Sequence, residues 1–213
     1  MATYDLDEQE QLDALKAWWK RWGSVAMLAL ALVVAAAAGW RYWQTRTLTQ
    51  NLEAAAVYQK LTQSLAGNDA KGAREAGAML IDQYQDTAYA PRAALLLAKL
   101  NAIGKDLKSA QTQLEWAAAH SKEPAVKDLA RLRLAGVQLD QKQYDAALKT
   151  LGGAHSDAFA FRFHDLKGDV LLAQGKQADA RTAYQAAFGK MAEDNPYRSI
   201  VELKLDALGG QAK

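Results

Sequence analysis

The sequence predicts an all-α fold: an N-terminal transmembrane helix followed by an α-solenoid of stacked helix pairs. The first observation is an uncharged stretch of nineteen residues, 22–40. The second is composition, because alanine is frequent, proline occurs only three times and no long β-branched run appears. The third is a weak repetition at intervals of 33 to 37 residues beyond residue 68, which is typical of stacked helical repeats.

The uncharged stretch has the length and flanks of a membrane span. A helix rises about 1.5 Å per residue, so these residues cover roughly the 30 Å hydrocarbon core of a bilayer. Tryptophans gather at both ends, and indole rings favour the headgroup boundary. The expected membrane-interface anchors are Trp18, Trp19, Trp22, Trp40 and Trp43. We therefore expect the lipid bilayer to be one partner of this chain.

Two other interpretations of the stretch compete with a permanent anchor. A cleaved signal peptide would find small residues at 35–39, but the preceding segment is long and carries five acidic side chains. A buried globular helix would show a polar stripe, and residues 28–38 have none. Three basic residues precede the stretch and two follow it: Lys16, Lys20 and Arg21 before, Arg41 and Arg46 after. Because basic residues are more frequent on the cytoplasmic side of a span, this small excess favours a cytoplasmic N-terminus. The expected parts are an acidic cytoplasmic tail at 1–21, a transmembrane helix at 22–43 and an exported helical domain at 44–213.

The helices of the domain are expected between starts and stops that the sequence marks. Apolar residues at three- and four-residue steps extend the first helix to about residue 66. Gly67 can take a left-handed stop there, Asp69 can cap the next helix, and Pro124 suits a first helical turn. The expected helices lie near 8–66, 69–84, 88–103, 106–119, 124–140, 143–152, 157–173, 177–190 and 196–208.

The C-terminal helices carry similar signals. Gly152 and Gly153 end one helix, and Asp157 is expected to cap the next. Asn195 is expected to cap a final helix with Pro196 in its first turn. Stacked helix pairs leave an apolar face open, so this final helix would close the array. Its inward surface would consist of Ile200, Leu203, Leu205 and Leu208.

Small residues recur at matching places in successive helix pairs, where they allow close approach, and larger residues fill the gaps. The matching sets are Ala98, Ala110 and Leu114, then Ala135, Ala147 and Leu151, then Gly168, Ala180 and Tyr184. The segment 168–187, GDVLLAQGKQADARTAYQAA, resembles a tetratricopeptide repeat, and 143–148, QYDAAL, resembles the start of a second helix in such a repeat. The resemblance departs from the usual motif at its early tryptophan, where this chain has His164 or Arg131.

The plan of the whole chain resembles the YfgM-like ancillary subunits of the bacterial Sec translocon. The matching features are the acidic segment YDLDEQEQ at 4–11, the tryptophan-flanked single span and the segment YAPRAALLLA at 89–98. The resemblance implies a single-pass protein of the bacterial inner membrane with a tetratricopeptide-like domain in the periplasm. It also implies two partners: the Sec translocon and a membrane-anchored periplasmic chaperone of the prolyl-isomerase class.

The sequence offers no constellation that predicts catalysis, a cofactor or a metal. Cysteine is absent, and the histidines at 120, 155 and 164 lack the i, i+4 spacing of a helical metal site. Glycine-rich phosphate loops and paired carboxylates do not stand out either. The net charge of +2 comes from interleaved signs, and no basic stripe predicts nucleic-acid binding. We therefore expect a protein that is not an enzyme and needs no cofactor.

What remains is binding, because stacked helical repeats present a concave face that accepts peptides or a partner's helix. The candidate partner-binding residues are those on the first helix of each pair that lie outside the packing set: Arg92, Lys99, Arg131, Arg133, Gln138, Arg162 and Lys167. The expected function is a membrane-anchored adaptor at the translocon that assists exported polypeptides as they emerge. The alternative is a tetratricopeptide scaffold for envelope assembly or cell division without an exported client.

Overall fold

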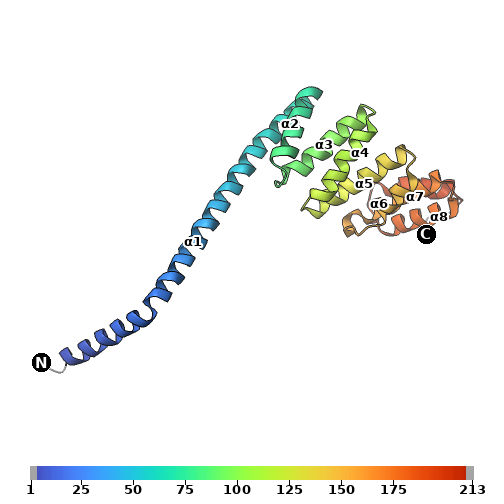
Figure 1. The fold of residues 1–213 in the computed structure, drawn as a ribbon. Coiled ribbons are helices and arrows are strands. Elements are labelled where there is room, and N and C mark those ends of the chain that lie inside the picture. Colours follow the sequence, from blue (N-terminus) through green and yellow to red (C-terminus); the bar gives the residue numbers. More distant parts are fainter. Residues whose placement is uncertain (1–3, 210–213) are drawn as a thin grey trace. The chain divides into compact units, whose positions relative to one another are not determined.

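A computed structural model describes residues 4–209, with side chains from residue 11 onward; the acidic segment expected at 1–21 therefore lies partly outside the described residues. Every regular element described is an α-helix (Figure 1). The helices are α1 (Tyr4–Ala66), α2 (Ala70–Gln83), α3 (Tyr89–Ile103), α4 (Leu107–His120), α5 (Pro124–Asp140), α6 (Tyr144–Leu151), α7 (Asp157–Ala173), α8 (Gln177–Gly189) and α9 (Arg198–Ala207). The chain divides into two compact units, Met1–Gln50 and Asn51–Lys213.

The first unit consists of the N-terminal part of α1. This helix is long and apolar enough to cross a membrane, and only 6% of its most apolar stretch of 18 residues is buried within the protein. All five tryptophans expected at the membrane interfaces are exposed: Trp18, Trp19, Trp22, Trp40 and Trp43. Because a buried core helix would hide such side chains, the exposure favours a helix that faces lipid.

The turns that join the helices of each pair are built alike, and this similarity defines the repeats of the second unit. In these four turns the residue with positive φ is Asn68 at 56°, Lys105 at 61°, Lys142 at 58° or Gly175 at 78°. Each is followed by a residue whose N–H donates to the carbonyl five positions earlier, as in Asp106 to Asn101 and Gln143 to Gln138. This is the hydrogen-bond pattern of a Schellman helix end. The second unit therefore contains four helix pairs: the end of α1 with α2, α3 with α4, α5 with α6, and α7 with α8.

The core of the second unit runs along the stack as four successive clusters. Three of the clusters join one helix pair to the next, for example Ala98, Ala110 and Leu114 with Leu134 of α5. The small and large residues that the repeat pattern singled out are all buried, among them Ala147 and Ala180 at 0% and Tyr184 at 1% exposure. Val201 and Leu205 of α9 close the final cluster. The expected repeat stack and its capping helix are confirmed, and this core aligns one helix of each pair along a common surface.

Several expected helix ends differ from the structure. Asp69 does cap α2, by accepting a hydrogen bond from the Gly72 N–H at 2.9 Å, but Asn68 rather than Gly67 takes the left-handed conformation. Asn195 does not cap α9; its Oδ1 accepts from the Tyr197 N–H at 2.9 Å, which makes a local turn before the helix begins at Arg198.

The other differences concern the inward face of α9 and the start of α7. Asp157 is the first residue of α7 and not its cap. Instead, the buried carboxylate of Asp128 accepts from both the N–H and the hydroxyl of Ser156, at 2.9 and 2.7 Å. Leu203, expected on the inward face of α9, is 70% exposed, and Ile200 is 43% exposed. The apolar face that α9 buries against the stack is therefore narrower than the sequence pattern indicated.

Candidate functional site

Three hollows follow one another along the first helices of the pairs, and together their lining residues form what we call the groove. The first, of about 500 Å³, lies between the end of α1 and α3 and is lined by Thr62, Leu65, Ala66, Asn68, Leu96, Lys99, Leu100 and Ile103. The second, of about 390 Å³, is lined by Ala98, Lys99, Ala102, Leu114, Arg133, Gly136, Val137 and Asp140. The third, of about 420 Å³, is lined by Leu132, Arg162, Asp165, Leu166, Asp169 and Tyr197.

The end of the groove at α1 and α3 is apolar. Leu65, Leu96 and Leu100 line its floor, and Ile103 is 72% exposed at the end of α3. An exposed isoleucine beside other leucines is an apolar patch that a partner's side chains can cover. Lys99 belongs to both the first and the second hollow, so a cation lies beside this apolar surface.

The end of the groove at α7 and α9 is polar, and its charges are tied to one another. Lys204 of α9 reaches Asp165 at 2.8 Å and Asp169 at 2.7 Å, both on α7. Burial raises the pKa of Asp165, although the ion pair with Lys204 acts in the opposite direction. Tyr197 donates to Asp165 at 3.2 Å, and Tyr184 donates to Asp169 at 2.8 Å. The two carboxylates are thus occupied in fastening α9 to α7.

This network also defines the protonation of its members. Burial is the largest cause that raises the pKa of Tyr184, and the hydrogen bond to Asp169 raises it further. The hydroxyl of Tyr184 therefore remains protonated and donates at neutral pH. Burial would lower the pKa of Lys204, but its bonds to Asp165 and Asp169 outweigh burial, and the net shift is upward. Lys204 is therefore charged where it meets the carboxylates. An internally satisfied network of this kind holds the fold and offers no reactive group.

Three of the candidate residues from the sequence line the groove: Lys99, Arg133 and Arg162. Lys99 and Arg133 share the second hollow, and the guanidinium of Arg162 lies 5.5 Å from the ring centroid of Phe161. Arg92 lies two helical turns before Lys99 on α3, where it forms an ion pair with Glu123 at 2.6 Å. Asp140 is the acidic residue of the second hollow, so basic side chains predominate there.

The other three candidates lie elsewhere. Arg131 donates to the Thr150 carbonyl at 2.7 Å and to the Ala154 carbonyl, which ties α5 to the end of α6 and to the loop that follows it. Gln138 is 6% exposed and accepts from the Thr150 hydroxyl at 2.8 Å. Lys167 is exposed beside a separate hollow between α7 and α8. Of the seven candidates, the fold thus brings three together in the groove.

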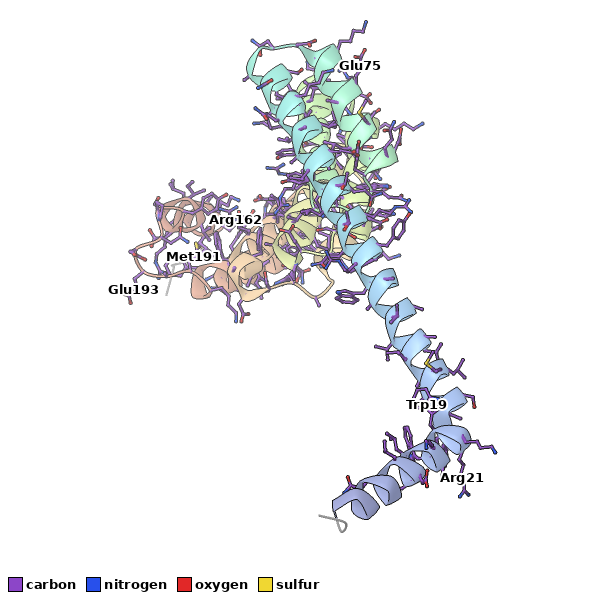
Figure 2. All side chains as sticks on the ribbon, turned by 90° about the vertical axis from the view of Figure 1, so that its left-hand side faces the viewer. Trp19, Arg21, Glu75, Arg162, Met191 and Glu193 are labelled. Carbon is purple, nitrogen blue, oxygen red and sulfur yellow. The ribbon has the colours of Figure 1, made fainter. Side chains whose placement is uncertain are left out.

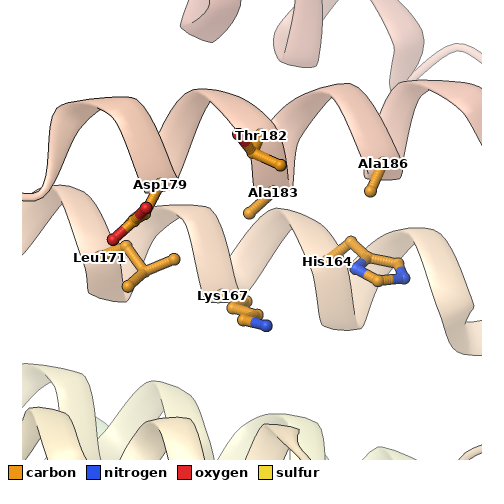
Figure 3. Close-up of a pocket in the computed structure, with 7 residues that line it drawn as sticks. All are labelled: His164, Lys167, Leu171, Asp179, Thr182, Ala183 and Ala186. Carbon is orange, nitrogen blue, oxygen red and sulfur yellow. The ribbon is translucent and has the colours of Figure 1, made fainter.

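The separate hollow measures about 420 Å³ and is shown in Figure 3. His164 and Lys167 come from α7, and Asp179 and Thr182 come from α8. Burial lowers the pKa of His164, and the charges of His155, Lys167 and Lys190 lower it further. His164 is therefore neutral at pH 7. Within the part of the chain that the structure describes, no group of His, Asp and Glu could hold a metal ion.

Sequence reasoning missed the Asp165, Asp169 and Lys204 network and the apolar end of the groove. The two aspartates are four residues apart and so share one face of α7, which is a visible signal, but Lys204 is 39 residues from Asp165. The apolar end could have been found from Ile103, an isoleucine that falls outside the repeating small and large positions. A packed solenoid with such a groove can bind a chain segment without altering it.

Comparison with known proteins agrees with this geometry. The tetratricopeptide repeat-like domain family matches residues 16–210. An "Ancillary SecYEG translocon subunit" of Neisseria gonorrhoeae is 32% identical over 95% of this chain and 98% of its own length. Proteins with the same name are 32% identical in Haemophilus influenzae, over 87% of this chain and 90% of the relative, and 30% identical in Escherichia coli K12, over 98% and 99%.

Proposed function

Because this chain belongs to the family of ancillary SecYEG translocon subunits and to the tetratricopeptide repeat-like domain family, we propose that it is a membrane-anchored adaptor of the Sec translocon. The observation that carries the proposal is similarity over nearly the whole length, because it includes the span as well as the repeat domain. The proposed adaptor role is non-enzymatic: the groove supplies surface for a partner, and the carboxylates of Asp165 and Asp169 are engaged by Lys204.

The proposed location is the inner membrane, with α1 as the single span, the N-terminus in the cytoplasm and the repeat domain in the periplasm. The lipid-facing tryptophans support the span, and the excess of basic residues before it supports the orientation. The parts proposed from the sequence follow from this topology: a tail at 1–21, a span at 22–43 and a periplasmic domain at 44–213. Confinement to the membrane raises the effective concentration of domain and translocon, so weak contacts suffice.

The second proposed partner is a membrane-anchored periplasmic chaperone of the prolyl-isomerase class, and unfolded exported polypeptides are the third. Resemblance to the family supports the chaperone, and the groove supports a segment with apolar side chains. Lys99 and Arg133 next to the apolar hollow favour a segment that carries acidic residues beside its apolar ones. Lys99, Arg133 and Arg162 are the proposed contact residues, with Arg92 at the edge.

The experiment is purification of the tagged full-length chain from gently solubilised inner membranes, with quantitative detection of translocon subunits and of prolyl isomerases. A matched variant carries an unrelated leucine-rich span in place of residues 22–43. The proposal expects both partners to be recovered with the native chain and translocon recovery to fall when the span is replaced. Recovery of neither partner, at a level no higher than an unrelated single-pass protein gives, would refute the adaptor role.

A further inference from the structure

The helix that precedes the span has an apolar stripe that no part of the protein covers within the described residues. Leu12, Leu15, Trp18, Trp19 and Trp22 follow one another at steps of three, three, one and three residues. Such steps place the five side chains on one face of a helix. The exposed fractions are 54% for Leu12, 60% for Leu15, 51% for Trp18, 55% for Trp19 and 49% for Trp22.

The opposite face of the same turns is charged. Asp13, Lys20 and Arg21 occupy it, and Lys16 lies at its edge, where its ammonium approaches the carboxylate of Asp13 at 3.2 Å. At about 100° per residue, Asp13 lies roughly 160° from Leu15 around the helix axis. A membrane span has apolar side chains on every side, whereas this segment has an apolar stripe and a charged back. The segment is therefore built differently from the span that follows it.

The helix changes direction where the two segments meet. The ribbon of α1 bends near Trp19 and Arg21 (Figure 2). The indole of Trp19 covers Gly23, where an added Cβ would lie 3.2 Å from the ring, so the absence of a side chain allows the ring to approach the backbone. A bend at this junction allows the amphipathic segment to leave the axis of the span.

The occupant of the stripe follows from its position in the chain. The inference rests on the proposed span: the stripe is continuous with it, and the stripe contains three tryptophans, which favour the headgroup boundary. Attraction to anionic lipid is not the driving force, because five acidic residues at 5–13 exceed the three basic residues at 16–21. Apolar burial and indole insertion are sufficient for a helix that is tethered at one end.

We propose that the segment from residue 11 to residue 22 is an interfacial helix that lies in the plane of the membrane, with the stripe of Leu12, Leu15, Trp18, Trp19 and Trp22 in the lipid. The charged face of this helix is in contact with water on the side of the membrane where the N-terminus lies. The acidic residues before it are then held at the membrane surface rather than free in solution. The inference does not depend on any translocon contact.

The test uses single cysteines, since the chain has none of its own. Full-length variants Leu12→Cys, Leu15→Cys, Asp13→Cys and Lys20→Cys carry a nitroxide label in phosphatidylcholine bilayers without other proteins. Collision with oxygen, which partitions into lipid, is compared with collision with a water-soluble nickel chelate. Leu30→Cys in the span and Arg133→Cys in the repeat domain provide the lipid and water references, and circular dichroism confirms that each variant folds.

The proposal expects the oxygen-to-nickel collision ratio to be several-fold higher at positions 12 and 15 than at positions 13 and 20. Added phosphatidylglycerol should leave that contrast unchanged, because charge does not drive the insertion. Water-like values at all four positions would show a helix standing in solution and would overturn the proposal. Lipid-like values at all four would mean that the span simply continues, and would overturn it equally. A contrast that appears only with anionic lipid would also contradict it.

Discussion

Replacement of Lys204 by methionine tests how the capping helix is fastened to the stack. The substitution removes the ammonium that lies 2.8 Å from Asp165 and 2.7 Å from Asp169, while it keeps the length of the side chain. The side chain of Asp165 is 7% exposed, so its carboxylate would be left charged and nearly without solvent. Removal of one partner from a buried ion pair costs about 3–5 kcal/mol.

Solvent reduces that cost here, because the side chains of Lys204 and Asp169 are 26% and 32% exposed. A loss of about 2–3 kcal/mol is therefore expected. For a protein of this size that loss lowers the Tm by about 4–12 °C. The assay is thermal unfolding of the full-length chain in detergent micelles, followed by circular dichroism at the helical band. The matched control is Lys127→Met, at an exposed lysine on α5, whose Tm should change little.

The pH dependence of the same variant gives a second readout. Burial raises the pKa of Asp165 above its ordinary value, and loss of Lys204 removes the main opposing influence. A carboxyl whose pKa is higher in the folded state contributes stability below its unfolded pKa, and that stability is lost as pH rises through the folded value. The deficit of Lys204→Met should therefore narrow as pH falls from neutrality to about 4. A Tm equal to that of the control, or a deficit unchanged by acid, would refute this account of the network.

Four further substitutions have defined outcomes. Gly168→Leu should lower the Tm, because an added Cβ would lie 2.5 Å from Cδ1 of Tyr184 and overpacking costs about 1–3 kcal/mol. Gly136→Ala should instead raise the stability by about 0.5–1 kcal/mol, because an added Cβ there would meet nothing within 4 Å. Ala180→Leu, at a position with 0% exposure, should destabilise the stack by about 1–3 kcal/mol; an unchanged melting curve would count against the repeat packing. Lys99→Glu should reduce crosslinking of the chaperone or of exported chains at the groove by several-fold with an unchanged Tm, and equal crosslinking would remove Lys99 from the proposed contacts.

The helices could be predicted from the sequence because their signals are local. Apolar periodicity, the proline at position 124 and the glycines at the ends of the helices placed eight of the nine described helices within two residues at each end. The first helix begins at Tyr4 rather than near residue 8, and the last begins at Arg198 because Asn195 makes a turn with Tyr197 instead of a cap. The hydrogen bond from the Tyr197 N–H to the Asn195 side chain sets that boundary, and amino-acid composition alone does not reveal it.

The groove could be predicted only in part, because its membership depends on contacts between distant segments. Lys99, Arg133 and Arg162 lie where the spacing of the packing residues indicated, on the uncovered face of first helices. Arg131 lies on a first helix too, but its guanidinium binds the carbonyls of Thr150 in α6 and Ala154 in the loop after it, 19 and 23 residues away. Those acceptors become available only after α6 and this loop have packed against α5, so no local pattern marks the residue as structural.

The central claim is that a repeat domain exposed to the periplasm is held to the inner membrane by an uncleaved span. Its most direct test is protease treatment of intact spheroplasts that carry a tag at the N-terminus, followed by the mass of the untreated chain. The account predicts that external protease removes the repeat domain, that a protected N-terminal fragment containing the span survives, and that the untreated chain retains its N-terminus. A domain that resists protease until the membrane is lysed, or a mature chain that begins near Gly39, would contradict it.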